Sequence, residues 1–134
     1  MHGTITSIPR HKMLIDGELV ASQKTIAVIN PTTEEVISEV PSGTLDDVNA
    51  AVLAAEKAQK SWSKLPAIER AQYLREIAQA IRVDRDHLAR VITEEQGKIL
   101  SLAQVEVDFS ADYLDYMAEF ARRYEGEKIG RAHV

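Results

Sequence analysis

The fold of this chain is decided by residues 94–127, which read EEQGKILSLAQVEVDFSADYLDYMAEFARRYEGE. The stretch predicts helix throughout, with Gly97 as a C-cap or joint before the last helix. Beyond Gly97, aliphatic side chains keep one face for about six turns, at 3.6 residues per turn. These are Leu100, Ala103, Val107, Ala111, Leu114, Ala118 and Ala121. We expect Gly126 to end this helix.

A second, aromatic stripe runs along the same predicted helix. Its members follow one another at spacings of four, three, four and four: Phe109, Tyr113, Tyr116, Phe120 and Tyr124. Stacking against nucleotide bases is one use for such rings, but no basic groove accompanies them. A helix that is apolar on nearly every side is normally buried on several sides. We therefore expect the aromatic stripe to pack against other parts of a larger protein.

Helices are also predicted upstream, from Thr44 onward. Thr44 with Asp47 three residues later approximates a capping box. Pro66 is expected in the first turn of a second helix, where proline is favoured. The polar run 84–86 is expected to separate this helix from a third. Apolar residues recur at helical spacing in three successive segments: Val48, Ala51, Val52, Ala55, Ala58 and Trp62; Ile68, Ala71, Leu74, Ile77, Ala78 and Ile81; Leu88, Val91 and Ile92. About four helices are thus expected within residues 44–126.

Residues 13–41 are predicted to form short strands. The Asp-Gly pair at 16–17 supplies the positive φ angles of a tight hairpin turn between two apolar triplets. A run rich in β-branched residues over 25–29 stops at the Asn-Pro pair 30–31, because proline cannot donate to a ladder. Residues 36–40 alternate apolar and polar side chains. The pattern predicts a hairpin followed by a second pair of strands.

Composition limits the function classes. The chain has 134 residues, enough for one core, and its 5% aromatic share predicts a core of Ala, Val, Ile and Leu. A net charge of −5 argues against a nucleic-acid partner or an anionic membrane surface, and no apolar run approaches a membrane span. Residues 1–12 lack the apolar region of a secretory signal and are expected to be a loose leader. The absence of cysteine excludes disulfides, thiolate metal sites and a cysteine nucleophile, and fits a cytoplasmic location.

Few side chains are candidates for chemistry. No glycine-rich phosphate loop occurs, and the four histidines at 2, 11, 87 and 133 are scattered and expected on the surface. Glu94 and Glu95 are adjacent, and paired carboxylates can act as acid and base. On a helix, however, sequence neighbours point apart, so one is expected to be exposed and the other to cap or pair. Glu106 and Asp108 likewise diverge and are expected on an exposed face.

Several motifs, in their order and spacing, resemble the N-terminal portion of the NAD(P)-dependent aldehyde dehydrogenase superfamily. They are IDGE at 15–18, INPTTEEV at 29–36, LPAIERA at 65–71, EEQGK at 94–98, VEV at 105–107 and AEFARRYEGE at 118–127. The resemblance covers about residues 13–128. It implies an α+β fragment, with short N-terminal strands and then about four helices, of the α/β aldehyde dehydrogenase fold. This fragment would be the outer part of the cofactor-binding domain.

The resemblance also implies a reaction. In the family a cysteine thiolate attacks the aldehyde, a hydride passes to NAD or NADP, and a glutamate-activated water hydrolyses the thioester. The catalytic Cys, Asn and Glu, and the lysine and glycines that hold the cofactor, lie downstream of the matching segment. We therefore expect no catalytic and no cofactor-binding residue here, and an inactive chain. The parent is expected to be a homo-oligomeric oxidoreductase acting on small hydroxyaldehydes such as lactaldehyde or glycolaldehyde.

The same resemblance implies one binding site. Some family members hold a monovalent cation with backbone carbonyls just before the Asn-Pro pair and a carboxylate just before the Gly-Lys pair. The corresponding residues here are Val28, Ile29 and Glu95. In the family a downstream segment completes this site.

The last six residues, IGRAHV at 129–134, leave the family pattern. Read in one frame, the start of a common sequencing adapter, ATC GGA AGA GCA CAC GTC, encodes these six residues. The tail is therefore expected to be a non-family segment derived from an adapter. An alternative interpretation of the whole chain is a free-standing helical module that binds other proteins through its aromatic stripe.

Overall fold

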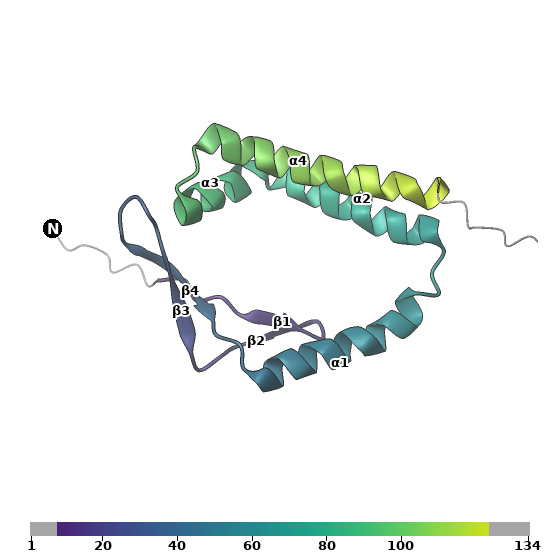
Figure 1. The fold of residues 1–134 in the computed structure, drawn as a ribbon, viewed down its shortest axis with the longest axis horizontal. Coiled ribbons are helices and arrows are strands. Elements are labelled where there is room, and N and C mark those ends of the chain that lie inside the picture. The colour runs from purple at the N-terminus through teal and green to yellow at the C-terminus, as the bar shows by residue number, and fades with distance from the viewer. Residues whose placement is uncertain (1–7, 124–134) are drawn as a thin grey trace, which may run out of the picture.

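The computed structural model describes residues 8–123, as two short hairpins followed by four α-helices and one 3₁₀ turn (Figure 1). The elements are β1 (Met13–Ile15), β2 (Glu18–Val20), β3 (Thr25–Ile29), β4 (Val36–Pro41), α1 (Leu45–Trp62), α2 (Ala67–Val83), α3 (Arg85–Gln96), α4 (Leu100–Glu119) and η1 (Phe120–Arg122). The strands and α1 lie on one side of the molecule, and α2, α3 and α4 form a layer on the other (Figure 1). The predicted α+β class is confirmed.

The strands follow the predicted turn chemistry. Asp16 and Gly17 have φ angles of 50° and 82°, and they close the antiparallel β1–β2 hairpin. In the antiparallel β3–β4 pair the register shifts between Val28 and Ile29, which marks a β-bulge. Residues 9–11 also run beside β4, where the His11 N–H donates to the Glu39 carbonyl at 2.9 Å. Hydrogen bonds thus hold this part of the segment predicted as a loose leader.

Helix α1 begins with the predicted capping box. The Thr44 N–H donates to Asp47 Oδ2 at 2.8 Å, and the Asp47 N–H donates to Thr44 Oγ1 at 3.2 Å. These reciprocal bonds satisfy donors that a helix start otherwise leaves unpaired. Apart from this fixed start, α1 is loosely covered, because none of its residues is fully buried. Its last residue, Trp62, packs its ring against Tyr73 of α2, with centroids 5.2 Å apart.

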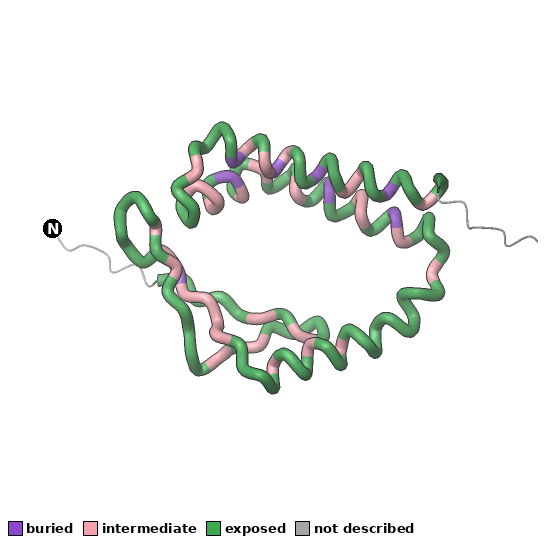
Figure 2. The backbone as a smooth tube through the Cα atoms, in the orientation of Figure 1, coloured by how far each residue is buried: buried purple, intermediate pink, exposed green. Residues whose placement is uncertain are grey.

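Figure 2 shows that most buried positions lie on α2, α3 and α4. The apolar core at these positions consists almost wholly of alanine. The fully buried apolar residues are Ala71, Ala78, Ala89, Ala103, Val107, Ala111 and Ala118. Small side chains let helix backbones approach closely, so most of the stabilising contact in this layer comes from packing along the α2–α4 and α3–α4 seams. Four of these residues belong to the aliphatic stripe predicted for the last helix, which confirms that stripe as the buried face.

Gly97 and its neighbours form the predicted joint. Gly97 has a φ of 69°, a left-handed conformation that ends α3, and α4 starts at Leu100. A Cβ atom on Gly97 would lie 3.2 Å from Pro31 Cγ, so the end of α3 packs directly on the turn after β3. Helix α4 ends at Glu119 and continues as η1. The predicted stop at Gly126 lies outside the described residues, as does the predicted tail at 129–134.

The molecule exposes far more apolar surface than its core buries. Among residues 8–123, seven apolar residues are buried, whereas twenty-four large apolar residues are exposed. Most of α1 and one side of α4 contribute to this excess (Figure 2). Exposed apolar faces of this extent are typical of surfaces that another part of a protein covers.

Candidate functional site

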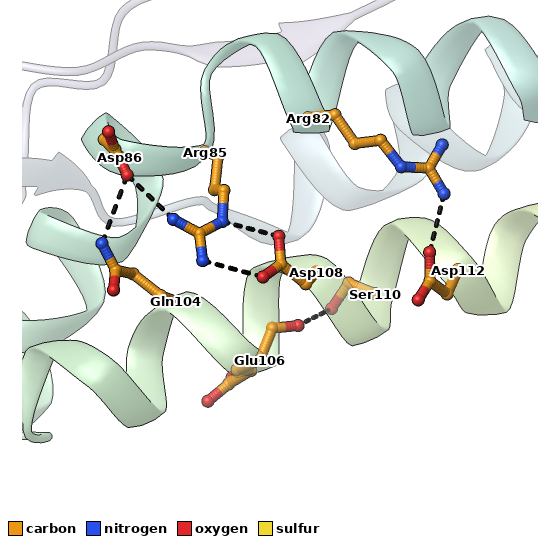
Figure 3. A network of polar contacts seen from close by, with 8 residues as sticks. All are labelled: Arg82, Arg85, Asp86, Gln104, Glu106, Asp108, Ser110 and Asp112. Atoms are coloured by element: carbon orange, nitrogen blue, oxygen red, sulfur yellow. Dashed lines mark hydrogen bonds and ion pairs between the residues drawn. The ribbon is translucent and has the colours of Figure 1, made fainter.

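A polar network clamps α3 to α4 (Figure 3). Arg85 donates through Nε to Asp108 Oδ1 at 2.6 Å and through Nη2 to Asp108 Oδ2 at 2.8 Å. A third nitrogen, Nη1, donates to Asp86 Oδ1 at 3.1 Å. Gln104 reaches the same Asp86 oxygen at 3.3 Å. This two-pronged arginine–carboxylate geometry fixes orientation as well as distance between the two helices.

A second arginine joins α2 to α4 through two different carboxylates. Arg82, at the end of α2, donates to Asp112 Oδ1 and to Asp115 Oδ2, both at 2.8 Å. Glu106 and Asp108 were predicted on an exposed face, and the structure leaves both only half-exposed. Asp108 pairs with Arg85, and Glu106 pairs with Lys98, which lies just before α4. The partners lie up to 23 residues away in sequence, so helical spacing within α4 alone does not reveal them.

The electrostatics of this network favour permanent charge. Hydrogen bonds from Arg85 hold the pKa of Asp108 below its usual range, and hydrogen bonds to Asp112 and Asp115 raise the pKa of Arg82. A carboxylate with a lowered pKa is a poor general acid or base near neutral pH. Both guanidinium groups already have carboxylate partners, which leaves them unsuited to binding a phosphate. The network is therefore suited to holding helices together and not to proton transfer.

The aromatic stripe forms a continuous ladder on the surface of α4 and η1. Successive ring centroids are 6.4 Å apart from Phe109 to Tyr113, 6.4 Å from Tyr113 to Tyr116, and 5.3 Å from Tyr116 to Phe120. Each of these four side chains is at least 40% exposed. Tyr124, the fifth predicted member, lies outside the described residues. The rings touch one another and leave their outer faces available for contact with other protein.

A hollow of about 250 Å³ lies between β4 and α3. It brings His11 and His87 together with the adjacent pair Glu94 and Glu95, a grouping that was not predicted. Within residues 8–123, no group of three or more His, Asp or Glu side chains could hold a metal ion. Both glutamates are exposed, and neither takes part in an ion pair within the described part of the chain, so the expected capping or pairing role is not found. The hollow lacks the geometry of a catalytic or metal centre.

The three residues of the predicted cation site lie on elements that meet. Val28 and Ile29 end β3 at the bulge, and Glu95 lies in the last turn of α3, which packs on the turn after β3 through Gly97 and Pro31. Glu95 lines the hollow beside β4, whose walls do not include Val28 or Ile29. The elements are adjacent, and the cation site itself stays a prediction.

Comparison with known proteins identifies the family. The model of the aldehyde dehydrogenase family matches residues 19–133. The chain belongs to the aldehyde dehydrogenase family. It is 53% identical over 126 residues to lactaldehyde dehydrogenase of Escherichia coli. The aligned residues make up 92% of this chain and 26% of that enzyme. The chain thus spans about a quarter of the length of this relative, and the resemblance found in the sequence is confirmed.

Solved structures agree with this assignment. A crystal structure of lactaldehyde dehydrogenase from Escherichia coli superposes with a TM-score of 0.90 and 51% identity, over 95% of this chain and 27% of that chain. A betaine aldehyde dehydrogenase from Staphylococcus aureus, in complex with NAD+, gives a TM-score of 0.85 and 37% identity over 90% of this chain and 25% of that chain. The described elements are therefore an N-terminal part of the aldehyde dehydrogenase fold.

The relatives differ in the cofactor that they use. Besides the NAD+ complex, D-glyceraldehyde dehydrogenase (NADP(+)) of Thermoplasma acidophilum is 38% identical over 88% of this chain and 24% of that enzyme. Aldehyde dehydrogenases related to this chain are thus NAD- or NADP-dependent. No helix within residues 8–123 is long and apolar enough to cross a membrane.

Proposed function

We propose that this chain is the N-terminal quarter of an NAD(P)-dependent aldehyde dehydrogenase that oxidises a small hydroxyaldehyde, such as lactaldehyde or glycolaldehyde, to the carboxylic acid. The observation that carries the proposal is the 53% identity to lactaldehyde dehydrogenase over 92% of this chain. Identity to the other relatives named above is lower, at 38% and 37%. Substrate residues lie elsewhere in such an enzyme, so the aldehyde is assigned by overall similarity.

Within such an enzyme this segment acts as scaffold. The chain contains no cysteine, so the nucleophile of a thiohemiacetal mechanism must come from outside it. Its described residues also do not fit a dinucleotide, because Arg82 and Arg85 are occupied by carboxylates and no glycine-rich phosphate loop is present. In this proposal these residues take part in no chemical step. Their role is to position helices beside the rest of the cofactor-binding domain.

Three further properties belong to the proposal. The whole enzyme takes NAD or NADP as hydride acceptor, which is the chemistry of its named relatives. It assembles as a homo-oligomer, and it works in the cytoplasm on a small aldehyde without nucleic acid or membrane as partner. The net charge of −5 and the absence of cysteine agree with these last assignments.

A chimera tests the proposed function. Residues 13–128 of this chain replace the matching segment of Escherichia coli lactaldehyde dehydrogenase, and NADH formation is followed with lactaldehyde, glycolaldehyde and betaine aldehyde. We expect a folded chimera that oxidises the two hydroxyaldehydes in preference to betaine aldehyde. A folded chimera that forms no NADH with any of them would refute the family role. The substrate residues of the chimera come from the Escherichia coli enzyme, so the substrate class is tested on the full-length parent of this chain, where a preference for betaine aldehyde would refute it.

The aromatic ladder favours one second candidate, a free-standing module that binds other proteins. Such a module needs a stable fold of its own, so it predicts a monodisperse chain with one cooperative thermal transition. The scaffold proposal predicts the opposite, because the apolar faces of α1 and α4 lack a cover. Heating the chain while recording Trp62 fluorescence and circular dichroism separates the two. Coincident, sharp transitions in a monomer favour the module, and broad or separate ones favour the scaffold.

A further inference from the structure

An arginine lines an otherwise apolar groove where α1 gives way to α2. The groove has a volume of about 370 Å³, and its walls come from α1, α2 and the end of α4. Its main lining residues are Trp62, Arg70, Tyr73, Leu74, Ile77 and Met117. The groove lies apart from the Arg85–Asp108 network, and none of the interactions described above uses its charged member.

The Nε atom of Arg70 is buried and has no hydrogen-bond partner among residues 8–123. Leaving a buried donor unpaired is unfavourable, and more so when the donor is charged. Native proteins leave few such groups without a partner. Around this donor the apolar walls are themselves half-exposed, with Tyr73 and Ile77 each 49% exposed and Met117 38%. The groove therefore requires an occupant that is mostly apolar and carries an oxygen acceptor.

We propose that this groove docks the part of an aldehyde dehydrogenase polypeptide that lies beyond the matched segment, and that an oxygen of that part accepts a hydrogen bond from Arg70 Nε. This inference rests on the proposed function and names the contact through which the scaffold is held. It is supported by length, because the chain covers only 26% of lactaldehyde dehydrogenase. About three-quarters of such an enzyme is thus available to cover the apolar surface that α1, α2 and α4 expose.

If Arg70 makes this contact, Arg70→Met should affect heat stability differently in the chain alone and in the chimera. In the chain alone, Arg70→Met removes an unpaired buried donor, so the thermal midpoint of the helical signal should stay the same or rise. In the chimera, the same change removes a charged hydrogen bond, so the temperature of half-inactivation should fall by roughly 3–10 °C. Arg90→Met, on an exposed arginine of α3 outside the groove, is the matched control and should change neither temperature.

A second substitution tests the apolar walls in case Arg70→Met prevents folding. Ile77 is only half-exposed in the chain alone, so Ile77→Ser should lower the thermal midpoint of the chain slightly and the half-inactivation temperature of the chimera by several degrees more. Val83→Ser is its control, because Val83 of the same helix is 79% exposed and does not line the groove. Neither variant alters a residue of the polar network.

Three results would overturn the inference. The first is an Arg70→Met chimera as heat-stable as the parent chimera. The second is an Arg70→Met chain that loses as much stability as the chimera, which would place the partner of Arg70 within the chain itself. The third is a dimer of the chain alone that Arg70→Met dissociates in sedimentation, which would make a second copy the occupant. An active chimera with any of these results would leave the proposed function standing.

Discussion

Arg85 of α3 and Asp108 of α4 face one another with two parallel hydrogen bonds, of 2.6 and 2.8 Å. The pair joins two helices across the Gly97 joint, next to the buried cluster of Ala89, Ala103 and Val107. Since both side chains remain partly exposed, solvent screens the attraction, and its main value is geometric. The pair fixes how α3 lies on α4 while the alanine seam supplies the contact area.

The pair predicts a specific pH dependence of stability. Arg85 lowers the pKa of Asp108 in the folded chain relative to its ordinary value of about 3.9. The stabilisation is therefore fully present above about pH 4 and is lost as the pH falls through the lowered folded-state pKa. Asp108→Asn should lower the urea midpoint of the helical signal near neutral pH, and this difference from the wild type should shrink below pH 4.

The control for the pH series is Glu56→Gln, on an exposed carboxylate of α1. It should leave the urea midpoint nearly unchanged at every pH. A difference between Asp108→Asn and the wild type that stays constant from neutral to acidic pH would contradict the assigned role of the pair.

Val107 should be the most sensitive aliphatic side chain of α4. It is only 4% exposed, so Val107→Ala removes two buried carbon groups and leaves a cavity, at a cost of about 2 kcal/mol in the free energy of unfolding. Val105→Ala, on the same helix at 61% exposure, should change it by less than about 0.5 kcal/mol. Urea titration of the chimera, in which the apolar faces of the segment are covered, measures both by circular dichroism. Equal losses would mean that α4 packs with another face.

Gly97 should tolerate no side chain. Its φ of 69° disfavours other residues, and a Cβ would press on Pro31 at 3.2 Å, so Gly97→Ala should cost roughly 1–2 kcal/mol of stability. Gly43→Ala is the control, because its Cβ would meet Met13 Sδ at an ordinary contact distance of 3.4 Å. The same urea titration compares them. A neutral Gly97→Ala would show that the α3–α4 joint is not held against the β3–β4 turn.

The aromatic ladder should control self-association of the chain alone. Phe109 is 68% exposed, so Phe109→Ser should reduce the aggregated fraction in dynamic light scattering without lowering the helical signal. Val83→Ser removes a comparably exposed apolar group away from the ladder and should have a smaller effect. If both variants aggregate as much as the wild type, the ladder is not the surface that drives association.

Local signals in the sequence were sufficient for most of the fold. The capping box of Thr44 and Asp47 and the left-handed turn at Gly97 depend on neighbouring residues, and both are found as predicted. The Arg85–Asp108 pair was missed because its partners are 23 residues apart and meet only after α3 folds back on α4. The grouping of His11 with His87 was missed for the same reason, since residues 9–11 reach α3 only through their pairing with β4.

The exposed ladder illustrates a different kind of limit. Periodicity places Phe109 and Tyr113 on one face of α4, and the structure confirms that they touch. Which protein surface covers them is not encoded in the helix itself. The monovalent-cation site at Val28, Ile29 and Glu95 has the same limit, because carbonyl ligands depend on backbone geometry and on a further segment that the family supplies.

The central claim is that this chain is a scaffold segment that contributes no catalytic group of its own. The most direct test measures NADH formation from lactaldehyde and NAD+ by the purified chain, alone and mixed with an Escherichia coli lactaldehyde dehydrogenase that lacks its matching segment. We predict no NADH from either part alone and NADH from the mixture. NADH formation by the chain alone would contradict the claim.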